Sequence, residues 1–166
     1  GTEFFMGFAR VILAMRRCPK FVVARVQGKA VGGGIGIIAA SDYAVASAAA
    51  AVKLSELAVG IGPFVVGPAI ERKIGLGGLQ ALAVDAASFR DAAWAERRGL
   101  YSRLVETTEE LDTTVDSLAA TLARSNPEAM ARMKTVFWRG TEEWDTLLPE
   151  RAAMSGQLVL SDFTKQ

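Results

Sequence analysis

The sequence has no histidine and only one cysteine, Cys18. Without histidine, the chain cannot supply the imidazole on which serine and cysteine nucleophiles and many zinc sites depend. A single cysteine cannot form an internal disulfide, which is typical of proteins from a reducing compartment. We therefore expect no metal site and a cytoplasmic location.

The sequence also lacks an excess of either charge and any long apolar run. Lys plus Arg number 19 and Asp plus Glu number 18, which leaves a net charge of +1. Such a balance offers no electrostatic footprint for nucleic acid or for an acidic membrane surface. No stretch approaches the roughly 20 apolar residues that a membrane span requires. We expect neither nucleic acid nor membrane as a partner.

Apolar residues are plentiful, at 51% of 166 residues, which is enough to bury the core of one domain. Hydrophobic periodicity predicts strands at 21–26, 42–46 and 52–54. It predicts helices at 3–17, 35–40, 63–74, 77–84, 91–98, 111–124, 127–138 and 142–158. We assign residues 1–105 to a mixed α/β core and residues 106–166 to a helical C-terminal region of the same domain.

Three details of these helices are also predicted. The first helix should bury one face, made of Phe4, Phe5, Phe8, Val11, Ile12 and Met15. Pro63 is expected at the first position of its helix, where proline is favoured. Pro149 is expected to bend or restart the last helix.

Five glycines fall within residues 28–36, in the sequence GKAVGGGIG. A dinucleotide fingerprint fails because Ile37 stands where its third glycine belongs, and a P-loop fails because its lysine is absent. Two interpretations stay open. The free N–H groups at the start of the following helix can hold an anion such as an enolate oxygen. Alternatively, the glycines only allow a helix and a strand to pack closely.

One carboxylate, Glu56, stands among apolar residues in the sequence KLSELAVGIGPF. Burial there should raise its pKa, which suits an acid/base group at neutral pH. Taken alone, such a residue is more simply explained as a surface glutamate or a helix cap. Asp42, at the end of a predicted helix, is expected to have a structural hydrogen-bonding role.

Together these segments resemble the crotonase family of enoyl-CoA hydratases and isomerases. The resemblance rests on the strand at 21–26, the sequence AVGGG at 30–34, Asp42, Glu56, Val59, Gly60, Pro63 and Gly67. It is close over residues 20–105 and loose over the helical remainder. It implies an α/β fold, a crotonase-like spiral of ββα units followed by a helical trimerisation region. It also implies that an N-terminal part of the family domain precedes this chain.

The resemblance further implies a site for a coenzyme A thioester. Gly33 aligns with one of two backbone amides that hold the thioester oxygen, and Glu56 aligns with the catalytic acid/base. The second amide and much of the coenzyme A cradle are expected upstream. Substrate binding is assigned to Val31, Gly32, Gly34, Ser55, Pro63 and Phe64. No cofactor is implied beyond the coenzyme A of the substrate, and a homotrimer or dimer of trimers is expected.

One departure from the family pattern narrows the function. Many hydratases hold water between two glutamates, but Gly36 stands where the first belongs. A single glutamate after Leu54 and Ser55 resembles bacterial methylglutaconyl-CoA hydratases of leucine degradation, while the apolar loop 61–64 resembles enoyl-CoA isomerases of fatty acid metabolism. We therefore favour hydration of an α,β-unsaturated acyl-CoA, with Δ3,Δ2-enoyl-CoA isomerisation as the alternative. A non-catalytic crotonase-fold binding subunit is a third hypothesis.

Overall fold

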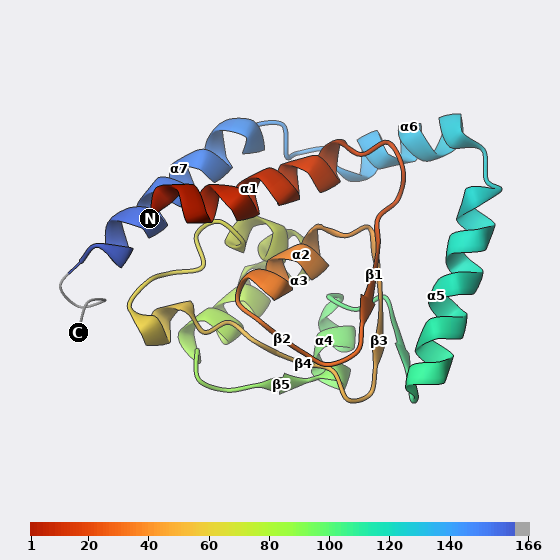
Figure 1. Cartoon of the computed structure of the whole chain (residues 1–166), viewed down its shortest axis with the longest axis horizontal. Helices are drawn as coiled ribbons and strands as arrows, with labels where there is room; N and C mark the ends of the chain where they lie inside the picture. The colour runs from red at the N-terminus through yellow and green to blue at the C-terminus, as the bar shows by residue number, and fades with distance from the viewer. Residues whose placement is uncertain (162–166) are drawn as a thin grey trace.

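A computed structural model describes residues 1–161, in which six strands form two small sheets covered by helices (Figure 1). The strands are β1 (Val23–Val26), β2 (Lys29–Val31), β3 (Tyr43–Ser47), β4 (Ala51–Lys53), β5 (Arg90–Asp91) and β6 (Arg103–Val105). The helices are α1 (Thr2–Arg17), α2 (Gly33–Ala40), α3 (Gly67–Val84), α4 (Ala92–Arg98), α5 (Thr108–Ala123), α6 (Pro127–Phe137) and α7 (Trp144–Val159), with a 3₁₀ helix η1 (Glu56–Val59).

The two sheets are built from a repeated unit of two strands and a helix. In the two complete units, β1-β2-α2 and β3-β4-α3, the first strand joins one sheet and the second joins the other. β6 extends the first sheet to the order β1-β3-β6, and β5 extends the second to β2-β4-β5, antiparallel to β4. β1 and β3 are parallel, as are β2 and β4, which pair Val31 with Lys53. Because β2 and β4 end side by side, the segments that follow them, at Gly32 and Leu54, begin next to each other. This arrangement positions the site described below.

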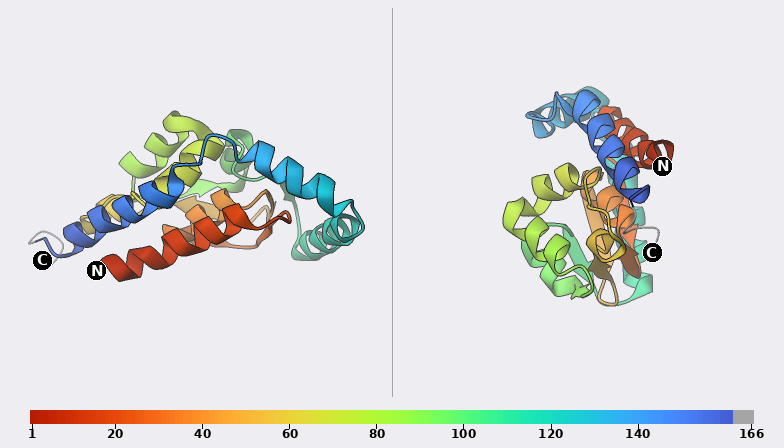
Figure 2. Two further views of the ribbon diagram at one scale, coloured as in Figure 1. Left: turned by 90° about the horizontal axis from the view of Figure 1, so that it is seen from above. Right: turned by 90° about the vertical axis from the view of Figure 1, so that its left-hand side faces the viewer.

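The main core lies between the sheets and the helices α1, α2, α3 and α7. Its largest fully buried side chains include Tyr101, Ile12, Ile35, Leu54, Ile70, Leu82 and Leu148. α1 and α7 lie side by side across the top of Figure 1, and Figure 2 shows the same pair from two other directions. A Cβ on Gly156 of α7 would lie 2.3 Å from Oγ1 of Thr2, so the two helices meet closely there.

The predicted buried face of α1 was partly wrong. Phe4 and Val11 are 68% and 44% exposed, whereas Ala9 and Leu13 are buried together with Ile12. The reason is tertiary: α1 packs against both α2 and α7, so the buried face follows these neighbours rather than the row of largest side chains.

The predicted helix start at Pro63 was also wrong. Pro63 lies in a loop, and α3 begins at Gly67 with Pro68 in its first turn. α3 runs to Val84, but Gly75 is non-helical, with φ 75° and ψ 169°, and divides it at the place expected between the helices predicted at 63–74 and 77–84. α7 runs through Pro149 without ending.

The short strands β2, β5 and β6, of two or three residues each, were not predicted. α5, α6 and α7 follow the mixed α/β part, within the predicted helical region 106–166. The last five residues of that region, 162–166, lie outside the described residues.

Asp42 has the structural role expected of it. Its carboxylate accepts hydrogen bonds from the Val22 amide at 2.8 Å, the Lys134 ammonium at 2.7 Å and the Trp138 indole at 2.9 Å. The Asp42 and Lys134 side chains are only 7% and 4% exposed. This buried ion pair ties α6 to the start of β1 and β3.

Candidate active site

The glycine-rich segment approaches Glu56 through bare backbone. Gly32 has a φ of 57°, a conformation that favours glycine, and its amide donates to the Lys53 carbonyl at 3.0 Å. A Cβ on Gly32 would lie 2.9 Å from Oε1 of Glu56. The positive φ disfavours any side chain at this position, and a Cβ there would also crowd the carboxylate.

Gly33 begins α2 and lines the cavities beside Glu56. The amides in the first turn of a helix lack an acceptor within the helix and lie at the positive end of its dipole. The Phe8 ring packs directly on this glycine, since a Cβ on Gly33 would lie 2.2 Å from Cε1 of Phe8. The start of α2 is thus a polar backbone element between an aromatic ring and a cavity.

Glu56 is the first residue of η1, directly after the segment that follows β4. Its Oε2 atom is buried and has no hydrogen-bond partner among residues 1–161. Burial raises the pKa of Glu56 above its ordinary value, and a contact with its own backbone amide offsets only part of this rise. A carboxyl group with a raised pKa in a cavity is a candidate acid/base.

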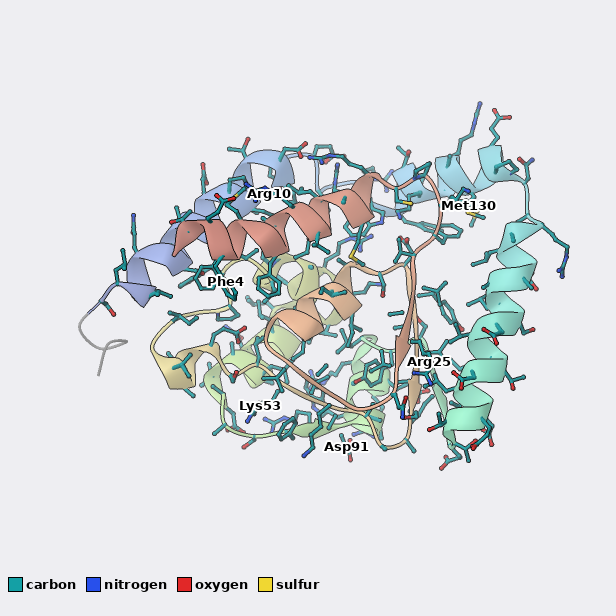
Figure 3. All side chains as sticks on the ribbon, in the orientation of Figure 1. Phe4, Arg10, Arg25, Lys53, Asp91 and Met130 are labelled. Carbon is teal, nitrogen blue, oxygen red and sulfur yellow. The ribbon has the colours of Figure 1, made fainter. Side chains whose placement is uncertain are left out.

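Two cavities meet at Glu56, with volumes of about 630 Å³ and about 40 Å³. Both are lined by Phe5, Phe8, Gly33 and Glu56. The larger is also lined by Gly1, Phe4, Ser55, Val59, Ile61 and Val159, and the smaller by Gly62, Pro63, Phe64, Val65, Val66 and Ser155. Phe4 lies on the side of α1 that faces η1 (Figure 3). The larger volume falls within the range of small-molecule sites.

The position of the missing first glutamate is filled by another side chain. A Cβ on Gly36 would lie 2.3 Å from Cγ1 of Val66 and 2.6 Å from its Cβ. A second carboxylate at position 36 would therefore need Val66 to move. Among the described residues that line the two cavities, Glu56 is the one carboxylate.

The predicted substrate-binding residues divide into two groups. Ser55, Pro63 and Phe64 line the cavities together with Gly33 and Glu56, and Gly32 touches the carboxylate. Gly34 and Val31 line neither cavity: the nearest neighbour of a Cβ on Gly34 would be Ala30, and Val31 is 42% exposed on β2. The binding role of all six stays a prediction.

The parts of the two cavities that come from helices distant in the sequence were not predicted. Phe5 and Phe8 come from α1, whereas Ser155 and Val159 come from α7. The phenylalanine row of α1 was visible as an apolar face, but nothing in it indicated a cavity. No sequence signal singled out Ser155, since a lone serine in a helix is unremarkable by pattern.

Residues 1–161 contain neither a cluster of metal-ligating side chains nor a membrane-spanning helix. No group of three or more His, Cys, Asp or Glu side chains is arranged to hold a metal ion there. Within the same residues, no helix combines the length and apolar character that crossing a membrane requires.

Comparisons with known proteins identify relatives over nearly the whole chain. The family model described as enoyl-CoA hydratase/isomerase matches residues 2–164. Mevalonyl-coenzyme A hydratase sidH of Aspergillus fumigatus is 35% identical over 120 residues, which cover 71% of this chain and 43% of the relative. A Mycobacterium tuberculosis protein named "Probable enoyl-CoA hydratase echA12" is 31% identical over 152 residues, covering 90% of this chain and 53% of the relative.

Solved structures match equally widely. An enoyl-CoA hydratase from Mycobacterium avium superposes with a TM-score of 0.89 at 25% identity, covering 99% of this chain and 64% of that chain. Another, from Mycobacterium avium subsp. paratuberculosis K-10, has a TM-score of 0.89 at 27% identity, covering 98% of this chain and 66% of that chain. The chain thus spans about half the length of the curated relatives reported above.

These matches confirm the expected fold, because the repeated ββα units and the C-terminal helices superpose on enoyl-CoA hydratases of the crotonase superfamily. The match of the family model leaves fewer than five residues at either end unmatched. The chain therefore belongs to the enoyl-CoA hydratase/isomerase family.

Proposed function

We propose that this protein hydrates an α,β-unsaturated acyl-CoA thioester, with Glu56 as its single acid/base and the Gly33 amide as an oxyanion donor. The observation that carries the proposal is the Glu56 carboxylate, whose Oε2 is buried without a partner in the described part of the chain and beside a cavity that Gly33 also lines. An unpartnered buried carboxylate is costly for folding. A reaction that uses it gives a reason for its presence.

In this reaction, Glu56 accepts a proton from a water molecule as the water oxygen forms a bond to Cβ of the substrate. The electron pair of the C=C bond moves towards the thioester, where the Gly33 amide stabilises the negative oxygen. Glu56 then returns a proton to Cα. Water is thereby added across the double bond, and no other reactant is consumed.

We propose 3-methylglutaconyl-CoA as the natural substrate, which would place the protein in leucine degradation. This finer assignment is supported by the sequence Leu54, Ser55, Glu56 and by Gly36 in place of a second carboxylate. The cavity of about 630 Å³ is large enough for a short branched acyl group. Coenzyme A enters only as part of the substrate, so no separate cofactor is proposed.

A second candidate, isomerisation of a 3-enoyl-CoA, is favoured by the apolar walls around Glu56. Phe5, Phe8 and Val66 surround the carboxylate, and Val66 fills the space beside Gly36. In an isomerase, the same carboxylate would remove a proton from one carbon and return it to another. Such a reaction needs one carboxylate and no water.

The proposed enzyme would act as a homotrimer or a dimer of trimers in the cytoplasm. Met133, Val136 and Phe137 of α6 are 44%, 58% and 53% exposed, so this helix offers apolar surface for a subunit contact. The single cysteine supports a reducing compartment.

The test is a Glu56→Gln variant of the natural gene product that contains this sequence. It keeps the shape of the side chain and removes its basicity, so kcat should fall about 10²–10⁴-fold while thioester binding persists. Glu71→Gln, which changes an exposed glutamate of α3, is the matched control.

The assay offers 3-methylglutaconyl-CoA, crotonyl-CoA and a 3-enoyl-CoA separately in D₂O. A hydratase yields a 3-hydroxyacyl product with deuterium at Cα, whereas an isomerase yields only a shifted double bond. If Glu56→Gln changes none of these rates, or if the wild-type protein binds acyl-CoA without turnover, the non-catalytic binding subunit becomes the better hypothesis.

A further inference from the structure

The smaller cavity beside Glu56 has the size of a water site. Its volume is about 40 Å³, whereas a buried water needs at least about 10–15 Å³ and two to four polar partners. Most of its lining is apolar, including the rings of Phe5, Phe8 and Phe64. The few polar groups that line it therefore decide whether water is held there and in which orientation.

Ser155 contributes a polar side chain from the far end of the sequence. The residue is 1% exposed and lies on α7. Helical hydroxyls commonly donate to the carbonyl four residues earlier, as Thr135 does to Ala131 at 3.2 Å. Within residues 1–161 the Ser155 hydroxyl makes no such bond. Ser155 lines the smaller cavity, so its hydroxyl is available to a water molecule held there.

The placement of Ser155 is fixed by close packing of its neighbour in the chain. A Cβ on Gly156 would lie 2.3 Å from Oγ1 and 2.8 Å from the amide nitrogen of Thr2. α7 is therefore held tightly against the start of α1 at this point. Glu56 lines the same cavity as Ser155, and the buried Oε2 of Glu56 has no partner in the described part of the chain.

We propose that Ser155 is a catalytic residue that holds the attacking water opposite Glu56. The inference rests on the proposed hydration. Ser155 Oγ accepts one O–H of the water and Glu56 accepts the other, which leaves an oxygen lone pair free to attack Cβ. Glu56 takes the proton and later delivers one to Cα, and Ser155 neither gains nor loses a proton. A neutral hydroxyl thus serves as the second water ligand, at a site where Val66 occupies the space beside Gly36.

The inference is tested by comparing two reactions of a Ser155→Ala variant. Hydration of crotonyl-CoA requires a positioned water, so its kcat should fall about 10-fold, as expected for the loss of one neutral hydrogen bond. Exchange of the Cα proton of butyryl-CoA with D₂O requires Glu56 and the oxyanion donor but no attacking water. Its rate should stay at the wild-type value. Thr146→Val, which removes a hydroxyl from the exposed face of α7, should change neither rate.

Each other outcome has a definite meaning. If Ser155→Ala hydrates at the wild-type rate while Glu56→Gln does not, the role of Ser155 is refuted and the proposed function stands. If Ser155→Ala lowers hydration and exchange equally, the residue is structural and the inference is overturned. If the wild-type protein hydrates no enoyl-CoA, the proposed function fails, and this inference fails with it.

Discussion

Removing Asp42 should destabilise the protein more than any comparable change of an exposed charge. Its carboxylate accepts from three donors, the Val22 amide, the Lys134 ammonium and the Trp138 indole, at 2.7–2.9 Å. In an Asp42→Ala variant, the carbonyl of Lys20, at 3.0 Å, is the one hydrogen-bond acceptor that Lys134 keeps among residues 1–161. Its ammonium would then be a buried charge without a counter-charge.

The expected size of this effect follows from the burial of the pair. Breaking a buried ion pair by removing one partner costs about 3–5 kcal/mol. For a protein of this length, each kcal/mol lowers Tm by about 2–4 °C, so the loss is about 6–20 °C. Lys134→Met should cost less, since Asp42 retains two donors. The double variant should be more stable than the sum of the single effects predicts, because the two residues are in contact.

Urea unfolding followed by tryptophan fluorescence measures these differences, and Trp138 reports directly on the loss of its hydrogen bond to Asp42. The matched control is Arg132→Met, which breaks an ion pair with Glu128 on the same helix as Lys134. The side chains of that pair are 80% and 72% exposed, so its loss should cost less than about 1 kcal/mol. If Asp42→Ala destabilises the protein no more than Arg132→Met, the structural role assigned to this ion pair is incorrect.

Three further predictions concern the candidate site. Gly33→Pro removes an oxyanion donor, but the proline ring would collide with Phe8, so the double variant Phe8→Ala/Gly33→Pro is compared with the single variant Phe8→Ala. The kcat of the double variant should be about 10²–10³-fold lower. Equal rates would exclude Gly33 as a donor. Burial raises the pKa of Glu56 in the folded protein, so the protonated carboxyl contributes stability that is complete below pH 4.5 and is lost as pH rises through the raised pKa. Thermal denaturation should therefore show that Glu56→Gln gains stability relative to the wild type between acid and neutral pH. The reverse trend would contradict this. Gly36→Ala should lower the free energy of unfolding by about 1–3 kcal/mol, because the new Cβ collides with Val66. Adding Val66→Gly to this variant should restore part of the loss, as measured by denaturant titration. No rescue would argue against this contact.

Local features of the sequence were sufficient to predict the strand β1 and the helix α2, and the motifs that resemble the crotonase family singled out Gly33 and Glu56. Each depends on residues that are close together in the chain. An apolar run between Pro19 and Gly28 indicates a buried strand, and a carboxylate within an apolar stretch indicates a raised pKa. The structure agrees on the direction of that pKa shift, because burial of Glu56 is its largest cause.

Only the tertiary structure decided what surrounds these candidates. The cavity walls at Phe8 and Ser155 come from helices more than 100 positions apart, and they meet because α1 and α7 pack against each other. Likewise, Val66 closes the space beside Gly36 only because α2 packs on the segment before α3. Hydrophobic periodicity describes which side of one element is apolar, but it contains no information on which distant element covers that side. The identity of the groups that face Glu56 is therefore a property of packing rather than of any local pattern.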